Sequence, residues 1–332
     1  MFNVTKVISS PDELIESLPL NPALAERKAT FDKMLKDNFL SKEKFVVVVG
    51  PCSADDTVAV HQYCQKLKEL ADKVADKIIV VARIYTSKPH SDGDGFLGLA
   101  FHDKADDKVD FEKGLAKCRQ MMIDCLKVGL PVADELLFGE HCSYFDDLVS
   151  YWFLGARSST DTLHRNYASG LETVVGVKNA TDGNLLQTAQ SLYAITKPKT
   201  FLYDGLQMET DGNKYVHAVL RGYSVNEQMV ANLDSASVQK MVDYCHKYNV
   251  DPFVMVDVSH ANSNKIAANQ IENALAVASN KDVHGVMIES YLNHGKGCGF
   301  GLSQTDECLS FEETENLIEK LYQLRCKTTC LK

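Results

Sequence analysis

Short runs of β-branched and apolar residues alternate with amphipathic stretches along most of this chain. The first run, at 45–50, holds four consecutive valines. It is too short for an ordinary helix and is typical of a strand buried on both faces. Further strands are predicted at 77–85, 130–136, 151–156, 173–178, 200–203, 217–221, 253–259 and 283–289. Because amphipathic stretches at 58–75, 111–127, 183–195, 235–248 and 264–279 separate most of them, the pattern indicates βαβ units and a parallel sheet.

The strand count favours a TIM (β/α)8 barrel over an open doubly wound sheet. The runs 200–203 and 217–221 are joined by a glycine-containing linker without a helix, so we expect eight barrel strands and one hairpin inserted near the sixth, ending at Arg221. No G-x-G-x-x-G motif follows the first strand, which argues against a dinucleotide-binding fold. Residues 1–44 are polar and helix-prone, with a helix start at Ser10 and Pro11. We predict a helical extension over 1–44 and one barrel domain over 45–332.

Composition excludes several classes of protein. The chain has 332 residues, 45% of them apolar, and a formal net charge of −10. An acidic protein has little general affinity for nucleic acid or anionic membranes, and no apolar run approaches the roughly 20 residues of a membrane helix. Ten cysteines are spread along a large chain that begins without a signal sequence, so we expect reduced thiols and a cytoplasmic protein.

Basic residues recur where predicted strands end. The carboxyl ends of barrel strands meet on one face of the fold, which is where barrel enzymes place their chemistry. A single such charge is usually a solvated rim residue. Several together in an acidic protein predict a cationic pocket for a small, multiply anionic ligand, since arginine suits bidentate contact with phosphate or carboxylate. The basic residues are Arg83, Lys88, Arg157, Lys178 and Arg221.

Metal-ligating side chains follow the same rule. Cys52, His260 and Glu289 end or follow the first, seventh and eighth predicted strands, which become neighbours when a barrel closes, and Asp306 lies in the next loop. A lone cysteine or histidine is more often structural. Convergence of thiolate, imidazole and carboxylate groups favours a divalent ion, and leaves manganese, iron, cobalt and zinc open.

At this point the sequence resembles the class I 3-deoxy-D-arabino-heptulosonate 7-phosphate (DAHP) synthases. The resemblance covers nearly the whole chain and is carried by ordered motifs. These are GPCSADD at 50–56, RIYTSKP at 83–89, GARSS at 155–159, HRNYASGL at 164–171, GVKNATDG at 176–183, LRGY at 220–223, DVSHANSNK at 257–265, GVMIES at 285–290 and SQTDECLSFEET at 303–314.

The resemblance implies a metal-dependent condensation of phosphoenolpyruvate (PEP) with erythrose 4-phosphate, the first step of the shikimate pathway. It implies metal ligation by Cys52, His260, Glu289 and Asp306, with manganese favoured. It also implies that PEP is held by Arg83, Ala156, Arg157, Lys178 and Arg221, with Glu135 near its reacting end and Lys88 meeting the aldehyde. Catalytic roles would fall to Lys88, Glu135 and His260, and the extension would support a homodimer or homotetramer and possible regulation by aromatic amino acids.

The loop after the second strand departs from the family pattern. Where members carry Lys-Pro-Arg-Thr, this chain has Lys88, Pro89, His90 and Ser91, and Leu97 replaces a later lysine. The arginine and threonine hold the aldehyde phosphate in family members, and histidine lacks the permanent forked charge of arginine. Three hypotheses remain: an ordinary DAHP synthase whose His90 and Ser91 contact the acceptor, a diverged synthase that uses another aldehyde, and a non-catalytic paralogue that binds PEP or an effector.

Overall fold

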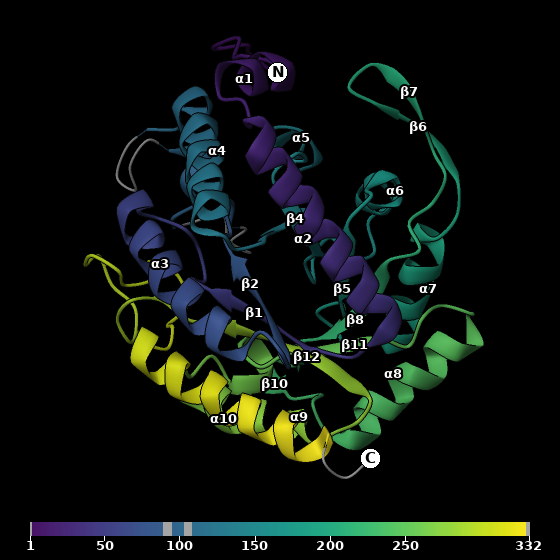
Figure 1. Ribbon diagram of the computed structural model, residues 1–332. Helices are drawn as coiled ribbons and strands as arrows, with labels where there is room; N and C mark the ends of the chain where they lie inside the picture. The colour runs from purple at the N-terminus through teal and green to yellow at the C-terminus, as the bar shows by residue number, and fades with distance from the viewer. Residues whose placement is uncertain (1, 89–94, 103–107, 330–332) are drawn as a thin grey trace.

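Eight parallel strands close into a barrel (Figure 1), as the sequence predicts. The computed structural model describes residues 2–88, 95–102 and 108–329. Around the barrel the strand order is β1-β12-β11-β8-β5-β4-β3-β2. The bounds are β1 Phe45–Gly50, β2 Ile78–Arg83, β3 Val132–Glu135, β4 Val149–Leu154, β5 Val174–Lys178, β8 Val216–Leu220, β11 Val254–Asp257 and β12 Val283–Glu289.

Helices follow the barrel strands and cover their outer faces (Figure 1). Four of the five predicted helical stretches start and end within about two residues of a helix, and α9 is shorter at its start than predicted. The helices α5, α6 and α10 were not predicted. The bounds are α3 Thr57–Val74, α4 Phe111–Val128, α5 Gly139–Cys142, α6 Thr162–Gly170, α7 Leu185–Ile195, α8 Ser235–Lys247, α9 Asn269–Ala278 and α10 Phe311–Thr329, with 3₁₀ turns η1 Leu99–Phe101 and η2 His260–Ser263.

The core has two layers, because successive side chains of a strand point to opposite faces. Val46 and Val48 belong to a cluster inside the barrel, whereas Val47 and Val49 belong to the larger cluster under the helices. The inner cluster includes Leu35 and others from the N-terminal extension, which forms α1 (Pro11–Ser17) and α2 (Pro22–Ser41). Figure 1 shows α2 crossing the barrel at the end where the strands begin. The extension therefore closes the amino-terminal mouth and leaves the carboxyl ends of the strands for the site.

The inserted hairpin differs from the prediction. It consists of β6 (Lys199–Tyr203) and β7 (Leu206–Thr210), and 216–220 is itself the sixth barrel strand. Strand β7 escaped the prediction because it is almost entirely exposed and carries few β-branched residues. A second hairpin, β9 (Tyr223–Val225) with β10 (Gln228–Val230), was also not predicted. It follows β8, so Arg221 lies between a barrel strand and this second hairpin and does not end the inserted hairpin.

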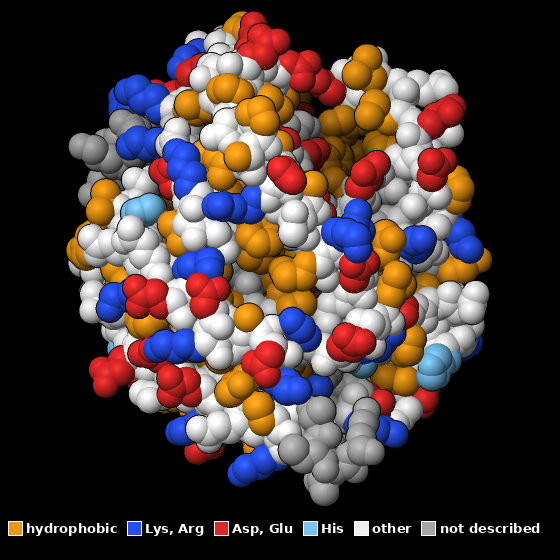
Figure 2. All heavy atoms as spheres, viewed as in Figure 1, with side chains coloured by type: hydrophobic (Ala, Val, Ile, Leu, Met, Phe, Trp, Pro, Cys, Tyr) orange, Lys and Arg blue, Asp and Glu red, His pale blue; other side chains and the backbone are white. Residues whose placement is uncertain are grey.

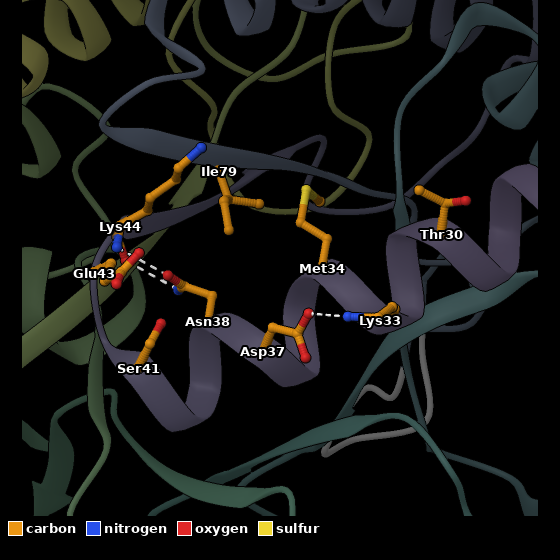
Figure 3. A pocket seen from close by; sticks show the side chains of 9 residues that line it. All are labelled: Thr30, Lys33, Met34, Asp37, Asn38, Ser41, Glu43, Lys44 and Ile79. Carbon is orange, nitrogen blue, oxygen red and sulfur yellow. Dashed lines mark hydrogen bonds and ion pairs between the residues drawn. The ribbon is translucent and has the colours of Figure 1, made fainter.

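No helix in the described parts of the chain is long and apolar enough to cross a membrane. A groove of about 360 Å³ lies beside α2 near the start of β2 (Figure 3). Asn38 shapes its edge, because its amide accepts from Lys44 N at 2.8 Å and donates to Lys44 O at 3.0 Å. The groove is lined by Met34 and Ile79 among charged side chains of both signs, and none of the residues singled out above lies in it.

Candidate active site

Most of the residues singled out in the sequence meet in one cavity at the carboxyl ends of the strands. The cavity measures about 230 Å³. It is smaller than the groove beside α2 and than a polar hollow of about 560 Å³ near β7. We take it as the candidate active site because the predicted site residues line it. Its lining residues are Lys88, Glu135, Gly155, Ala156, Arg157, Lys178, Thr181, Arg221, Ser224, His260, Lys265 and Asp306.

Two of the predicted residues lie outside the described part of the chain. These are His90 and Ser91, which the sequence analysis expects to contact the acceptor. Three others, Cys52, Arg83 and Glu289, are buried and do not line the cavity. The structure therefore places eight predicted residues on the cavity wall and three beneath it.

A cluster of metal-ligand side chains forms one side of the site. The ligand atoms of Cys52, Glu289 and Asp306 all lie within 4.8 Å of one another, and Cys52 Sγ is 3.8 Å from Asp306 Oδ2. The strand register explains this meeting, since Gly50 of β1 pairs with Glu289 of β12. His260 lies beside this group of three, with its Nε2 3.6 Å from Glu289 Oε1. Thiolate, imidazole and carboxylate groups together suit a borderline divalent cation, and we call Cys52, Glu289 and Asp306, with His260 beside them, the donor cluster.

Lys88 points into this cluster. Its Nζ lies 2.8 Å from Cys52 Sγ and 3.9 Å from Asp306 Oδ2. Burial lowers the pKa of Lys88, but electrostatic interaction with Cys52, Glu289 and Asp306 outweighs burial and raises it. Burial raises the pKa of the Cys52 thiol itself to about 11. Burial opposes ionisation of Asp306 as well, yet Lys88 and His260 lower its pKa to about 2. The lysine is therefore a fixed ammonium beside the donor cluster.

Arg83 lies beneath the cavity and is 1% exposed. Its Nη2 donates to Glu289 Oε1 at 2.8 Å and to Cys52 O at 3.2 Å, and its Nε donates to Pro51 O at 3.1 Å. The guanidinium stacks on the Tyr85 ring, 3.8 Å from its centroid. Among the described residues its Nη1 has no hydrogen-bond partner. One buried donor thus remains to meet an anion.

Asp257, for which the sequence predicts no role, connects Lys178 of the cationic group with His260 beside the donor cluster. Its Oδ2 lies 3.0 Å from Lys178 Nζ and 2.9 Å from His260 Nδ1. Burial raises the pKa of Asp257, but His260 and Lys178 outweigh this effect and hold it well below its usual value. Asp257 therefore directs the imidazole so that Nε2 faces Glu289 and the donor cluster.

The opposite side of the cavity is cationic. Arg157, Lys178 and Arg221 line it. Burial lowers the pKa of both Lys178 and Arg221, only partly opposed by Asp257. The backbone of Arg221 is fixed by Asn179, whose Oδ1 accepts from Arg221 N at 2.9 Å. An anionic ligand would supply the negative charge that stabilises these three buried cations.

Glu135 closes the cavity against Gly155. A Cβ on Gly155 would lie 1.9 Å from Glu135 Oε1, so the absence of a side chain there makes room for the carboxylate. Three further lining residues, Thr181, Ser224 and Lys265, were not assigned a role from the sequence. Lys265 Nζ lies 3.3 Å from Asp306 Oδ1. Its place at the end of the DVSHANSNK motif was the signal that could have identified it.

Comparison with known proteins agrees with this geometry. Residues 38–326 match the family model described as the DAHP synthetase I family. The chain belongs to the DAHP synthetase I family. As a member, it is a transferase of the type that forms a carbon–carbon bond.

Relatives match along almost the whole chain. It is 31% identical to a Tyr-sensitive phospho-2-dehydro-3-deoxyheptonate aldolase of Salmonella typhimurium, over 96% of this chain and 93% of the relative. An aldolase of the same name from Corynebacterium glutamicum is 32% identical, over 95% of this chain and 90% of the relative. The structure of the phospho-2-dehydro-3-deoxyheptonate aldolase from Francisella tularensis aligns with a TM-score of 0.92 at 31% identity, covering 98% of both chains.

Proposed function

We propose that this member of the DAHP synthetase I family condenses PEP with erythrose 4-phosphate to give DAHP and phosphate. The observation that carries the proposal is the division of one cavity into a cationic side and a donor cluster. The names of the relatives, all phospho-2-dehydro-3-deoxyheptonate aldolases, support the same reaction. Because Tyr-sensitive and Phe-sensitive forms are among them, we place the enzyme in aromatic amino acid biosynthesis through the shikimate pathway.

PEP occupies the cationic side in this proposal. Arg157, Lys178 and Arg221 hold its phosphate and carboxylate beside Ala156, and the free Nη1 of Arg83 approaches from beneath. Arginine forks and a buried lysine suit these two anionic groups. This placement leaves C3 of PEP facing the donor cluster, with Glu135 beside the reacting end.

The residues of the donor cluster fit a divalent cation, with manganese favoured. Cys52, His260, Glu289 and Asp306 would hold it, and their mixed thiolate, imidazole and carboxylate chemistry also admits iron, cobalt or zinc. When bound, the cation supplies Lewis-acid polarisation of the aldehyde carbonyl.

In the condensation, Lys88 donates a proton and Glu135 directs a water molecule. C3 of PEP attacks the aldehyde carbon, and the Lys88 ammonium donates its proton to the resulting alkoxide. Water then adds at C2 with loss of a proton, and the C2–O bond to phosphate breaks as phosphate leaves. Glu135 lies at the cavity wall where it can direct that water.

The enzyme acts in the cytoplasm as a homodimer or homotetramer in this proposal, with the 1–44 extension taking part in assembly. Exposed apolar side chains support assembly: Leu202 is 74% and Leu206 60% exposed on the β6–β7 hairpin, and Phe2 is fully exposed. Figure 2 shows apolar side chains in a hollow beside this hairpin. Such a patch is typical of a surface that a second subunit covers.

The test is a manganese-supplemented assay of phosphate release from PEP, with erythrose 4-phosphate and a panel of other aldoses and aldose phosphates. We expect efficient turnover of erythrose 4-phosphate. The variant Lys178→Met should lose PEP binding while keeping its bound manganese, which provides the control. Turnover of a different aldehyde alone would establish a diverged synthase, and no turnover with any aldehyde by the manganese-loaded protein would overturn the proposal in favour of a non-catalytic role.

A further inference from the structure

Asp134 and Glu135 are neighbours on β3 but face opposite sides of it. Glu135 lines the cavity, and Ala133, two positions earlier on the same face of the strand, belongs to the inner core. Val132 belongs to the outer core, so the alternation of a strand sends Asp134 away from the cavity as well. Asp134 is 1% exposed. A buried carboxylate outside the cavity cannot touch a substrate, and its hydrogen bonds show what it does instead.

Those hydrogen bonds hold the segment that carries Lys88. Asp134 Oδ2 accepts from Thr86 Oγ1 at 2.6 Å, and Oδ1 accepts from Thr86 N at 3.1 Å. Oδ1 also accepts from Glu135 N at 2.7 Å. One side chain therefore fixes the residue two positions before Lys88 and, at the same time, the backbone of Glu135.

The same segment is held from its other side. Ala100 N donates to Thr86 O at 3.0 Å, and Lys88 N donates to Leu97 O at 2.7 Å. Gly98 has a φ of 104°, and a Cβ there would lie 2.3 Å from Thr86 O. Glycine is therefore required for this close approach. With both sides fixed, Lys88 extends from a rigid base to Cys52 Sγ.

We propose that Asp134 is a positioning residue for the acceptor half of the reaction: its bonds to Thr86 set the position of the 86–88 segment and thus the reach of Lys88 toward the aldehyde. The identity of the aldehyde rests on the proposed function, but the hydrogen bonds between Asp134 and Thr86 do not depend on it. Asp134 itself contacts neither substrate. Its loss should therefore affect the acceptor more than PEP, because three of the four cationic residues proposed to hold PEP, Arg157, Lys178 and Arg221, lie at the ends of other strands.

The protonation of Asp134 supplies an independent signature. Burial raises its pKa to about 7, although hydrogen bonds from Thr86 and Glu135 lower it. Hydrogen bonds to an ionised carboxylate are roughly twice as strong as those to a neutral group, so the segment is held more firmly above pH 7 than below it. The titratable groups that interact with Asp134 are Glu135 on its own strand, Tyr85 beside Thr86, Cys118 on α4 and Cys142 on α5.

Two substitutions separate the charge from the hydrogen bonds. In Asp134→Asn the amide oxygen still accepts from the two backbone N–H groups and the amide nitrogen donates to Thr86 Oγ1, so the bonds remain and the titration is lost. Asp134→Ala removes both. Asp146→Asn is the matched control, because Asp146 is a half-buried carboxylate whose pKa is raised by burial to about 6, but it accepts a hydrogen bond from Tyr167 instead.

The first measurement needs no substrate: hydrogen exchange of the amides in 84–88 in the manganese-loaded enzyme. We expect the fastest exchange at Thr86 and Lys88 in Asp134→Ala, exchange between that variant and the wild type in Asp134→Asn, and no change in the Asp146 variant. The second is steady-state kinetics. Asp134→Ala should raise the acceptor KM by about tenfold or more with the PEP KM within about twofold.

The pH profile completes the test. The acceptor KM of the wild type should rise by about fivefold as the pH falls from 8 to 6, whereas Asp134→Asn should resemble the low-pH wild type throughout. Substrate phosphates titrate in the same range, and comparison of the two proteins removes their effect. Unchanged exchange at 84–88, or equal changes in both KM values, would overturn the proposal; if Asp134→Ala does not fold, Thr86→Val supplies the same comparison. Lack of turnover by the wild type would refute the proposed function, while the exchange data would still decide the role of Asp134.

Discussion

Gly155→Ala tests whether Glu135 acts in the reaction, because the structure predicts that this substitution moves one carboxylate and little else. The new Cβ would lie 1.9 Å from Glu135 Oε1 and 2.9 Å from its Cδ. Ordinary contact begins near 3.4 Å, so the oxygen must retreat by about 1.5 Å. Since the obstacle is the end of a flexible side chain, the backbone has no reason to shift.

The expected effects on stability and catalysis are therefore very different. Gly155 does not have a positive φ, so alanine is allowed there and the free energy of unfolding should change by less than about 1 kcal/mol. A misplacement of 1 Å at a reacting group can cost roughly 10²-fold in rate. We expect kcat to fall about a hundredfold, measured by phosphate release, with an unchanged urea midpoint.

Two variants control this experiment. Gly297→Ala meets nothing closer than Leu302 Cδ1 at 3.6 Å and should leave kcat unchanged. In a Glu135→Ala background, Gly155→Ala should cost nothing further, because the group it displaces is already absent. Wild-type kcat in Gly155→Ala, or an additive effect in the double variant, would refute the role given to Glu135.

Three further predictions concern the donor cluster, stability and assembly. Cys52→Ala should weaken manganese binding by more than about tenfold in calorimetry, whereas Cys118→Ala, buried elsewhere on α4, should not. Burial raises the pKa of Asp146 from 3.8 to about 6, so the folded state binds the proton more tightly and the wild type loses stability as pH rises from about 4 to 6. In urea unfolding, Asp146→Asn should gain about 2 to 3 kcal/mol relative to the wild type between pH 3.5 and 7.5, and a constant difference would contradict this cause. Leu202→Asp should yield smaller species in sedimentation, and an unchanged mass would exclude the hairpin as an interface; Val58→Asp on α3 is the control.

Much of the fold and of the site can be predicted from the sequence, because in a barrel the order of the strands along the chain determines which strands are neighbours. Residues 45–50 predict a buried strand, and closure alone brings Cys52 to Glu289, more than two hundred positions away. Patterns of burial could not reveal β7, since an exposed hairpin has no apolar face to mark it. They also could not assign Asp257, because its role depends on two partners from different elements.

Asp134 is another residue whose role could not be predicted from the sequence pattern. Two adjacent acids end β3, and the sequence does not say which one faces the cavity, because the phase of a four-residue strand is set by its neighbours. The resemblance to the family points to Glu135, and the structure places it on the cavity wall. Asp134 went unassigned because nothing in its local pattern indicates a bond to Thr86.

The site has one group of cationic residues and one group of metal-ligand residues, and we expect ligand binding at each group to stabilise the folded protein. Arg157, Lys178 and Arg221 gather on one side, while Cys52, Glu289 and Asp306 gather on the other. Burying like charges together is costly, because each group loses solvation and repels its neighbours. PEP would relieve this repulsion in the first group. The carboxylates of the second group already pair with Arg83, Lys88 and Lys265, and a divalent cation would add direct ligand bonds there. Each ligand should therefore raise the melting temperature alone, by mass action on the folded state. Together they should raise it further, because the two ligands bind different side chains.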